Sequence, residues 1–388
     1  MAAAAAAAAA AQWPQLVRRH CGTTDRFMQA DLARVRQLYA HWQRVLPGVT
    51  PYYAVKCNSD PRLLRTLADA GAGFDCASAN ELGLVADMGV AASRLLHAHP
   101  CKPPGHIAHA AAAGVDLTTF DSADELHKLR RHHPRTEVLL RIRCDDGTAR
   151  CKLGGKYGAE ESEVADLLAA ARAAGINVRG VAFHVGSAAG DPQAYARAVR
   201  ASAAVCRAAR ALGHDADTLD VGGGFTSRSL DSIADVVRPL LRDLWGGKRV
   251  IAEPGRYFAE TPFTLFCQVH GKRVRGGRRK YWISDGLYGL FNCVLYDKAR
   301  PVASPLRLTR DGAGRPADGN DGDDDPQFAS TIFGPTCDGL DVVIEDCSLP
   351  ELSVGDWVVF PDMGAYTLPG ASDFNGFEAT KTPVVYTG

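Results

Sequence analysis

Residues 51–60 (PYYAVKCNSD) place a single lysine, Lys56, at the end of an apolar, β-prone run. A lysine amine forms a Schiff base with a carbonyl group, and a partly desolvated site keeps it from being held as an ammonium ion. Taken alone, such a decapeptide is more often a surface lysine at a strand end. Its chemistry therefore depends on which other side chains the fold brings to the same place.

Short apolar runs alternate with helical patterns between residues 31 and 262, and eight of these runs read as strands. The predicted strands are 51–56, 73–78, 94–99, 115–120, 137–143, 178–185, 217–221 and 249–252. Eight strands with intervening helices are the number that closes a (β/α)8 TIM-like barrel. A doubly wound open sheet is the alternative, but the glycines at 222–224 lack the GxGxxG spacing of a dinucleotide-binding turn.

Short β runs replace the helical pattern after about residue 263, which predicts a C-terminal β-sandwich or β-barrel domain over 263–388. We expect the N-terminal strand 26–30 to join this domain, with the barrel spanning 31–262. The basic run 272–280 (KRVRGGRRK) predicts a solvated hairpin. Residues 311–326 predict an acidic flexible loop and no metal site, because EF-hand spacing is absent. Residues 1–25, which start with Met1 and ten alanines, predict a low-complexity tail outside the fold.

The composition is that of an ordinary globular enzyme, with 44 basic and 44 acidic residues in 388. This balance argues against nucleic acid as a partner. Eleven cysteines without a CxxC pair favour free thiols in a reducing compartment. No apolar run is long enough to span a membrane, and the alanine run lacks the features of a signal or transit peptide. The cytoplasm is therefore the expected compartment.

Polar residues and glycines gather at the predicted C-terminal ends of the barrel strands, where barrel active sites lie. They are Lys56, Asp75, His184, Ser187, Gly222, Gly223, Gly224, Glu253, Gly255 and Arg256. Glycine turns and an arginine suit a phosphate, a glutamate suits a protonated ring nitrogen, and a histidine offers a flat face for stacking. Lys56 could in addition bind an aldehyde. A ligand that combines a phosphate, a protonated ring nitrogen and an aldehyde is pyridoxal 5′-phosphate.

Nine motifs follow one another between about residues 31 and 377: PYYAVKCN, FDCAS, HVGS, DVGGGF, EPGRY, DGLYGLFNCVLYD, GPTCDGLD, MGAYT and FNGF. In this order they resemble the eukaryotic ornithine decarboxylase family, which belongs to the fold III, alanine-racemase-like pyridoxal-phosphate decarboxylases. The resemblance implies decarboxylation of L-ornithine to putrescine and CO2, the entry step of polyamine biosynthesis. Lysine or arginine decarboxylation is an alternative within the family. A catalytically inactive binding protein, similar to the antizyme inhibitors, is an alternative from another class.

The resemblance also implies a role for each matching residue. Lys56 would hold the cofactor as a Schiff base, His184 would stack on its ring, and Cys337 would return a proton to the substrate carbon. Further cofactor contacts would come from Asp75, Arg141, Ser187, Gly222, Gly223, Gly224, Glu253, Pro254, Gly255, Arg256 and Tyr366, with Glu81 acting less directly. Tyr296, Asp297 and Asp338 would bind the distal part of the substrate.

In this family the GPTCDGLD loop reaches into the active site of a second subunit. The resemblance therefore implies a homodimer with shared sites, and it places Lys156 and Asp341 at a cross-subunit ion pair. Two positions depart from the family pattern. Ala188 and Ala189 stand where the family usually has a glycine, which predicts a stiffer phosphate loop. Lys298 stands where the family commonly has histidine, and it either competes for Asp297 or points to solvent.

Overall fold

The computed structural model describes residues 10–145, 147–151, 153–308, 314–316 and 326–388. The chain divides into two compact units, one of residues 33–259 and one that combines residues 1–32 with 260–388. Most of the predicted acidic loop and the first nine residues of the predicted tail lie outside the described residues. Within the described residues, no helix is long and apolar enough to cross a membrane.

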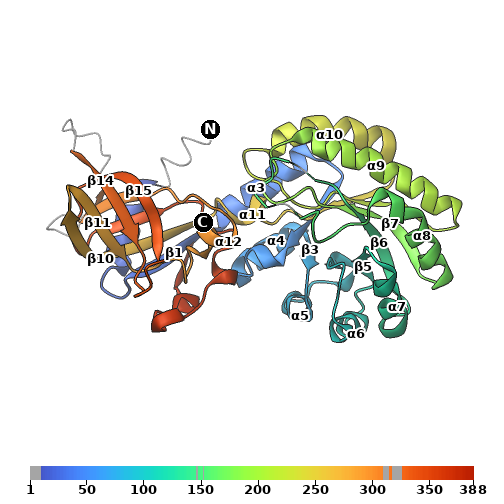
Figure 1. Ribbon diagram of the computed structural model, residues 1–388, viewed down its shortest axis with the longest axis horizontal. Coiled ribbons are helices and arrows are strands. Elements are labelled where there is room, and N and C mark those ends of the chain that lie inside the picture. The colour runs from blue at the N-terminus through green and yellow to red at the C-terminus, as the bar shows by residue number, and fades with distance from the viewer. Residues whose placement is uncertain (1–9, 146, 152, 309–313, 317–325) are drawn as a thin grey trace. The chain divides into compact units, whose positions relative to one another are not determined.

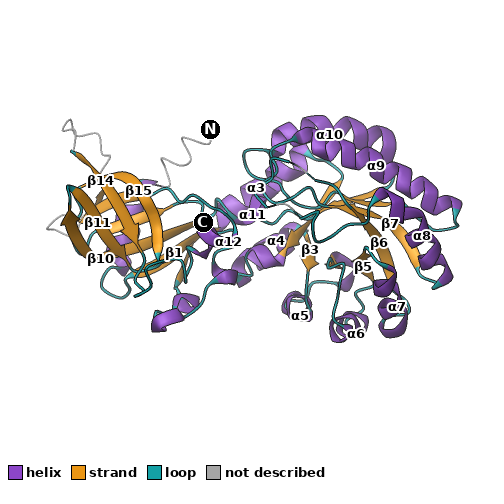
Figure 2. Cartoon of the chain, viewed as in Figure 1, coloured by secondary structure: helices purple, strands orange, loops and turns teal. Residues whose placement is uncertain are grey.

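Eight parallel strands close into a barrel in the order of the chain, with the last strand paired to the first, as predicted. The strands are β2 (Val49–Ala54), β3 (Gly73–Cys76), β4 (Leu95–His97), β5 (Leu117–Phe120), β6 (Glu137–Ile142), β7 (Asn177–Phe183), β8 (Thr218–Asp220) and β9 (Arg249–Ala252). Helices cover the outside of the barrel (Figures 1 and 2).

These helices are α3 (Leu32–Val45), α4 (Pro61–Ala70), α5 (Ala79–Asp87), α6 (Pro104–Ala112), α7 (Ala123–His132), α8 (Val164–Ala173), α9 (Pro192–Ala211), α10 (Leu230–Trp245) and α11 (Arg256–Ala259), with 3-10 turns at η1 (Val55–Cys57), η2 (Ala92–Arg94) and η3 (Glu161–Glu163). Helix α4 shows how the sequence sets their ends. Asp60 accepts hydrogen bonds from the backbone N–H groups of Arg62 and Leu63, and Gly71 ends the helix in the left-handed conformation.

The prediction that Lys56 ends the first strand is wrong by two residues. Strand β2 stops at Ala54, and Lys56 lies in the 3-10 turn η1. The chain has to turn here because Asp60 starts helix α4 only four residues later, and its backbone N–H already donates to Asn58. The turn exposes Lys56 while Val55 and Cys57 on either side remain buried.

The second unit is built on one large mixed sheet in the order β13-β12-β16-β10-β11-β14-β15, and β1 pairs with both β10 and β17. Its strands are β1 (Arg26–Asp31), β10 (Phe263–Arg275), β11 (Arg278–Ile283), β12 (Ser304–Leu308), β13 (Gly314–Pro316), β14 (Gln327–Phe333), β15 (Val342–Pro350), β16 (Trp357–Phe360) and β17 (Val384–Thr387). Short helical segments are α12 (Asn292–Tyr296), η4 (Leu368–Gly370), η5 (Phe374–Gly376) and η6 (Ala379–Lys381). The N-terminal strand thus joins this sheet, and β10 and β11 form the expected basic hairpin around Gly276 and Gly277.

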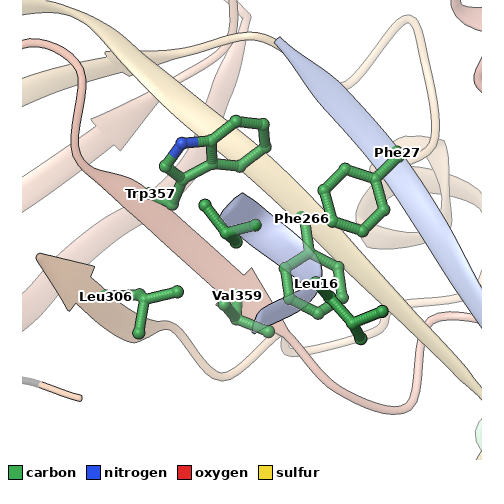
Figure 3. Close-up of a cluster of buried hydrophobic side chains, with 7 residues drawn as sticks. Leu16, Phe27, Phe266, Leu306, Trp357 and Val359 are labelled. Atoms are coloured by element: carbon green, nitrogen blue, oxygen red, sulfur yellow. The ribbon is translucent and has the colours of Figure 1, made fainter. Parts of the chain in front are cut away.

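The predicted tail over residues 1–25 is too long, because Trp13–His20 form helix α2. Leu16 and Val17 of this helix are buried in a cluster with Phe27, Phe266, Leu306, Trp357 and Val359. Figure 3 shows the side chain of Leu16 beside Phe266 in this cluster. The rings of Phe27 and Phe266 stack at 4.5 Å between centroids. An eight-residue helix is not stable alone in water, so its packing on the sheet must hold it.

Replacing Leu16 by alanine should lower the free energy of unfolding of this unit by about 2–4 kcal/mol, because it removes a buried side chain from a packed cluster. Urea unfolding followed by tryptophan fluorescence would measure the change. Arg19→Ala, at an exposed position of the same helix, is the matched control and should have little effect. Equal effects of the two substitutions would show that the helix does not pack on the sheet.

Candidate active site

Lys56 and Asp75 form an ion pair at the C-terminal ends of the first two barrel strands. Asp75 is completely buried, and one of its oxygens, Oδ1, has no hydrogen-bond partner among the described residues. Glu81 lies close by, and its carboxylate accepts the N–H of Ala77 at 2.6 Å. Desolvation raises the pKa of Glu81, and the charge of Asp75 raises it further. The lysine amine therefore faces anionic groups and is held in one place.

His184 follows strand β7 and carries a neutral ring. Its Nδ1 atom accepts the backbone N–H of Gly186 at 3.0 Å, so the ring proton must be on Nε2. Desolvation lowers the pKa of His184 well below its usual value, and the nearby charges of Arg141 and Lys56 lower it further. A neutral ring can stack on a protonated heterocycle without charge repulsion.

Two turns of backbone come together beside His184. Ala189 donates its N–H to the carbonyl of Gly224 at 3.1 Å. A Cβ on Gly223 would lie 2.8 Å from Nε2 of His184, and one on Gly224 would lie 2.5 Å from the carbonyl oxygen of Gly186. Gly224 also has a φ of 99°, which disfavours any other residue. The glycines are thus required for the backbone to approach this closely.

Ser187 and Arg256 meet at the same turns. The guanidinium Nη2 of Arg256 donates to the hydroxyl of Ser187 at 3.1 Å. Arg256 is almost completely buried at the start of α11, and it follows Pro254 and Gly255 on the turn after β9. A Cβ on Gly255 would lie 2.9 Å from Cβ of Cys57, beside Lys56. A serine, a buried arginine and glycine turns are the groups that hold a phosphate.

Two carboxyl groups lie next to each other at the ends of strands β8 and β9. Burial raises the pKa of Asp220 to about 7. Desolvation raises the pKa of Glu253 well above its ordinary value, and the neighbouring Asp220 raises it further. The Glu253 side chain retains some accessibility, whereas Asp220 has none. Sequence reasoning selected Glu253 and missed Asp220, although an aspartate at the end of an apolar strand was a usable signal.

Arg141 extends from strand β6 and contacts the ring of Tyr157, with its guanidinium carbon 5.2 Å from the ring centroid. Lys156 approaches the same ring at 5.0 Å, and the ring of His99 meets it edge-on at 5.8 Å. Neither Tyr157 nor His99 was among the predicted site residues. The motifs that carried the family resemblance do not include them, so no sequence signal pointed to these two positions.

The predicted substrate residues lie in the second unit. Tyr296 is 74% exposed and Asp297 is buried, so these neighbours face opposite ways. Lys298 is exposed and has a φ of 53°. Tyr366, the predicted phosphate ligand of this unit, has a φ of 58°. A left-handed conformation at a non-glycine residue costs energy and marks a backbone that its surroundings hold in place.

Cys337 and Asp338 lie in the exposed loop between β14 and β15. The Asp338 carboxylate accepts the hydroxyl of Tyr288 and the N–H of Leu340, and these two bonds lower the pKa of Asp338. The backbone N–H of Cys337 donates to Asn375 at 3.2 Å. Asp341, which ends the loop, is buried and accepts from Leu287 N–H and from both the N–H and the hydroxyl of Thr336. The loop is thus fixed while its two predicted functional side chains remain accessible.

Comparison with known proteins identifies the family. Residues 32–260 match the family model described as "Pyridoxal-dependent decarboxylase, pyridoxal binding domain". The chain belongs to this family. A chloroplastic ornithine decarboxylase of Nicotiana glauca is 48% identical over 360 residues, which cover 91% of this chain and 82% of that protein. The ornithine decarboxylase of Schizosaccharomyces pombe is 43% identical over 374 residues, covering 95% of this chain and 85% of that one.

Solved structures agree with this assignment. The agmatine-bound arginine decarboxylase of Paramecium bursaria Chlorella virus superimposes with a TM-score of 0.90 at 39% identity, covering 96% of this chain and 98% of that one. The family membership makes the chain a pyridoxal-phosphate-dependent decarboxylase. The barrel fits this cofactor on its own observations: glycine turns with Ser187 and Arg256, a neutral His184, an amine at Lys56 and a carboxylate at Glu253.

The turn that carries Ser187 contains a strained residue. Ala188 has a φ of 51°, which lies in the left-handed region that favours glycine. Its neighbour Ala189 has no such positive φ and is buried. The predicted stiffening of the phosphate loop therefore has a physical cause, because a left-handed alanine is costly where a glycine is not.

Ala188→Gly should leave the free energy of unfolding unchanged or raise it by up to about 1 kcal/mol, because relief of the strain offsets the added freedom of the unfolded chain. Ala189→Gly is the matched control and should lower it by about 1 kcal/mol. Denaturant midpoints of the two variants would test this. If both fell by the same amount, Ala188 would not be strained.

Proposed function

We propose that this enzyme decarboxylates L-ornithine to putrescine and CO2, as the entry step of polyamine biosynthesis. The observation that carries the proposal is the set of groups at the barrel strand ends, Lys56, His184, Glu253, Ser187 and Arg256, whose chemistry fits pyridoxal phosphate. The curated relatives at 40–48% identity over about nine-tenths of the chain are named ornithine decarboxylases.

Each of the matching residues would have a part in holding the cofactor. In the barrel, the Gly222–Gly224 turn, Ser187, Gly255 and Arg256 would bind the phosphate, and Glu253 with Pro254 beside it would face the ring nitrogen. His184 would stack on the ring and Lys56 would hold the aldehyde, with Asp75 and Arg141 supporting these groups. Tyr366 of the second unit is proposed as a further phosphate ligand. When bound, the cofactor supplies an electron sink for the electron pair left behind by CO2.

The second unit supplies the substrate-binding groups and the proton donor. Asp338 remains ionised because two hydrogen bonds lower its pKa, so it can pair with the distal ammonium of ornithine. Tyr296 and Asp297 are proposed to meet the distal part of the substrate as well, although their side chains face opposite ways in this structure. The Cys337 thiol is exposed and can return a proton to the carbon that lost CO2.

Arginine is a second candidate substrate, because the Chlorella virus structure of the same fold is an arginine decarboxylase. Lysine is a third, because Lys298 departs from the residue that is usual in ornithine-specific relatives. Lys298 is exposed, which favours the interpretation that it points to solvent. An inactive binding protein is disfavoured, since all three predicted catalytic residues, Lys56, His184 and Cys337, are present.

The substrate proposal is tested by measuring CO2 release from L-ornithine, L-lysine and L-arginine side by side with one preparation of enzyme and cofactor. We expect kcat/KM to be highest for ornithine. Lys56→Ala, which lacks the amine, is the control for background release. A higher kcat/KM for lysine or arginine would overturn the substrate proposal and leave the decarboxylase assignment intact.

We also propose that the active enzyme is a homodimer in which Cys337 and Asp338 of each chain complete the site of the other. The loop that carries them is surrounded by exposed apolar side chains, including Leu340 at 57% and Phe374 at 45% exposure. Phe374 stacks on Tyr288, which in turn donates to Asp338. Exposed apolar groups next to functional side chains are typical of a surface that a partner covers.

Mixing the Lys56→Ala chain with the Cys337→Ala chain should recover about a quarter of the wild-type activity, because half of the random dimers then hold one intact site of two. Steady-state CO2 release after subunit exchange would measure the recovery. A mixture of Lys56→Ala with the Lys56→Ala/Cys337→Ala double variant contains no intact site and is the control. Recovery no greater than in that control would disprove the shared site.

The cytoplasm is the proposed compartment. Its support is the set of eleven free cysteines, which suits a reducing environment. The Nicotiana relatives are named chloroplastic, so a plastid location of the tagged full-length chain would overturn this proposal.

A further inference from the structure

Asp220 is a fully buried carboxyl group for which the proposed function has no role. It ends strand β8, and its Oδ1 atom accepts the N–H of Gly222 at 2.8 Å. Its other oxygen, Oδ2, is also buried and receives no hydrogen bond from any donor in the part of the chain that the structure describes. A buried carboxylate oxygen without a donor is costly, so this atom requires an explanation.

The neighbour of Asp220 is Glu253. Strands β8 and β9 are paired with Asp220 opposite Ile251, and the N–H of Glu253 donates to the carbonyl of Gly222. This backbone pairing brings the two side chains within hydrogen-bonding reach of each other. Two carboxylates offer only acceptors, so a hydrogen bond between them needs a proton on one of them.

The surrounding charges favour retention of that proton. Asp75, Lys56 and Arg141 are charged groups that act on the pair. With Asp75 the pair makes three carboxyl groups against these two cations, and Glu81 lies close to Asp75, so a retained proton reduces an excess of negative charge. Burial raises the pKa of Asp220 to about 7, and the pKa of Glu253 is raised as well. Adjacent buried carboxyl groups generally share a proton in this way.

Which carboxyl group holds the proton follows from what each one faces. Glu253 is the more accessible of the two and is proposed to face the ring nitrogen, where an anion is needed. Asp220 is sealed from solvent, and its Oδ1 atom is already occupied by Gly222. The proton is therefore best placed on Oδ2 of Asp220, a buried oxygen that receives no hydrogen bond from the described residues.

We propose that Asp220 is a positioning residue: it remains a carboxylic acid whose Oδ2–H donates to Glu253 and orients that carboxylate toward the ring nitrogen of the cofactor. The inference rests on the role of Glu253 in the proposed function. Asp220 touches neither cofactor nor substrate, and its proton is not transferred during the reaction.

Asp220→Asn is the most informative substitution, because asparagine is neutral and has nearly the same shape as a protonated aspartic acid. Its carbonyl oxygen can accept from Gly222, and its amide can donate to Glu253 from the position of Oδ2–H. Asp220→Ala removes both contacts. Binding of pyridoxal phosphate is measured by absorbance titration of protein freed of cofactor. The dissociation constant should stay within about threefold of wild type for Asp220→Asn and rise by about tenfold or more for Asp220→Ala.

A double-mutant cycle separates an effect through Glu253 from an effect through the Gly222 turn. In a Glu253→Ala background, Asp220→Ala should change the dissociation constant by less than about twofold, because the group through which it acts is gone. An equal effect in both backgrounds would overturn the inference. So would an Asp220→Asn variant as weak as Asp220→Ala, because Asp220 would then act as an anion.

The pH dependence of stability gives a second measurement that needs no cofactor titration. The pKa of folded Asp220 is raised to about 7, so wild type loses stability as pH rises from the ordinary aspartate pKa of about 4 to about 7, whereas asparagine has no proton to lose. The thermal midpoint of Asp220→Asn relative to wild-type holoenzyme should therefore rise between about pH 5 and pH 7 and level off at higher pH, and a constant difference from about pH 5 to pH 7 would overturn the inference. If Glu253→Ala alone left cofactor binding unchanged, the assignment of Glu253 in the proposed function would fail, and the inference would fail with it.

Discussion

The closing pair of the barrel, β2 with β9, is the interaction on which the site depends. Val49 pairs with Val250 and Pro51 with Ala252, which joins segments about two hundred residues apart in the sequence. The chain beyond β2 then leads to Lys56, and the chain beyond β9 leads to Glu253 and Arg256. In a parallel barrel, the C-terminal ends of all the strands lie at one rim. The pairing of β2 with β9 therefore closes the core and also brings the side chains of the site together.

Charge balance is the second constraint on this rim. Parallel strand ends bring Asp75, Asp220 and Glu253 close together, and the positive charges of Lys56 and Arg141 oppose theirs. A site with this excess of carboxyl groups favours cationic groups such as a protonated ring nitrogen. The same excess would destabilise the folded chain if every carboxyl group were ionised, which is why the number of retained protons matters for both stability and cofactor binding.

Much of the fold could be predicted from the sequence because its strands are short apolar runs bounded by turns. The eight barrel strands were predicted on this basis, with ends displaced by a few residues at most. Helix α6 is hard to recognise in the sequence because Pro103, Pro104 and Gly105 are typical of a loop, although proline is tolerated in a first helical turn. Strand β12 is hard to recognise for a related reason, since it contains Pro305 and lies next to the edge strand of the sheet.

What could not be predicted depends on contacts between distant segments. Helix α2 is held by Phe27 and Phe266 rather than by its own propensity. The strain at Ala188 lies in a turn whose next residue, Ala189, bonds to Gly224 from a distant part of the sequence. The motif that contains Asp220 was interpreted through its glycines. The proposed role of Asp220 depends on the burial of its side chain beside Glu253, which the structure describes.

The path of the chain has a consequence for synthesis on the ribosome. Strand β1 pairs with β10 and β17, so the sheet of the second unit holds both early and late segments, while the barrel is a continuous insertion between them. Residues 32–262 must be translated before β10 exists, which takes roughly ten to fifty seconds at usual elongation rates. Strand β1, whose first five residues are buried in the folded protein, therefore remains without its sheet partners until the chain beyond the barrel has been made.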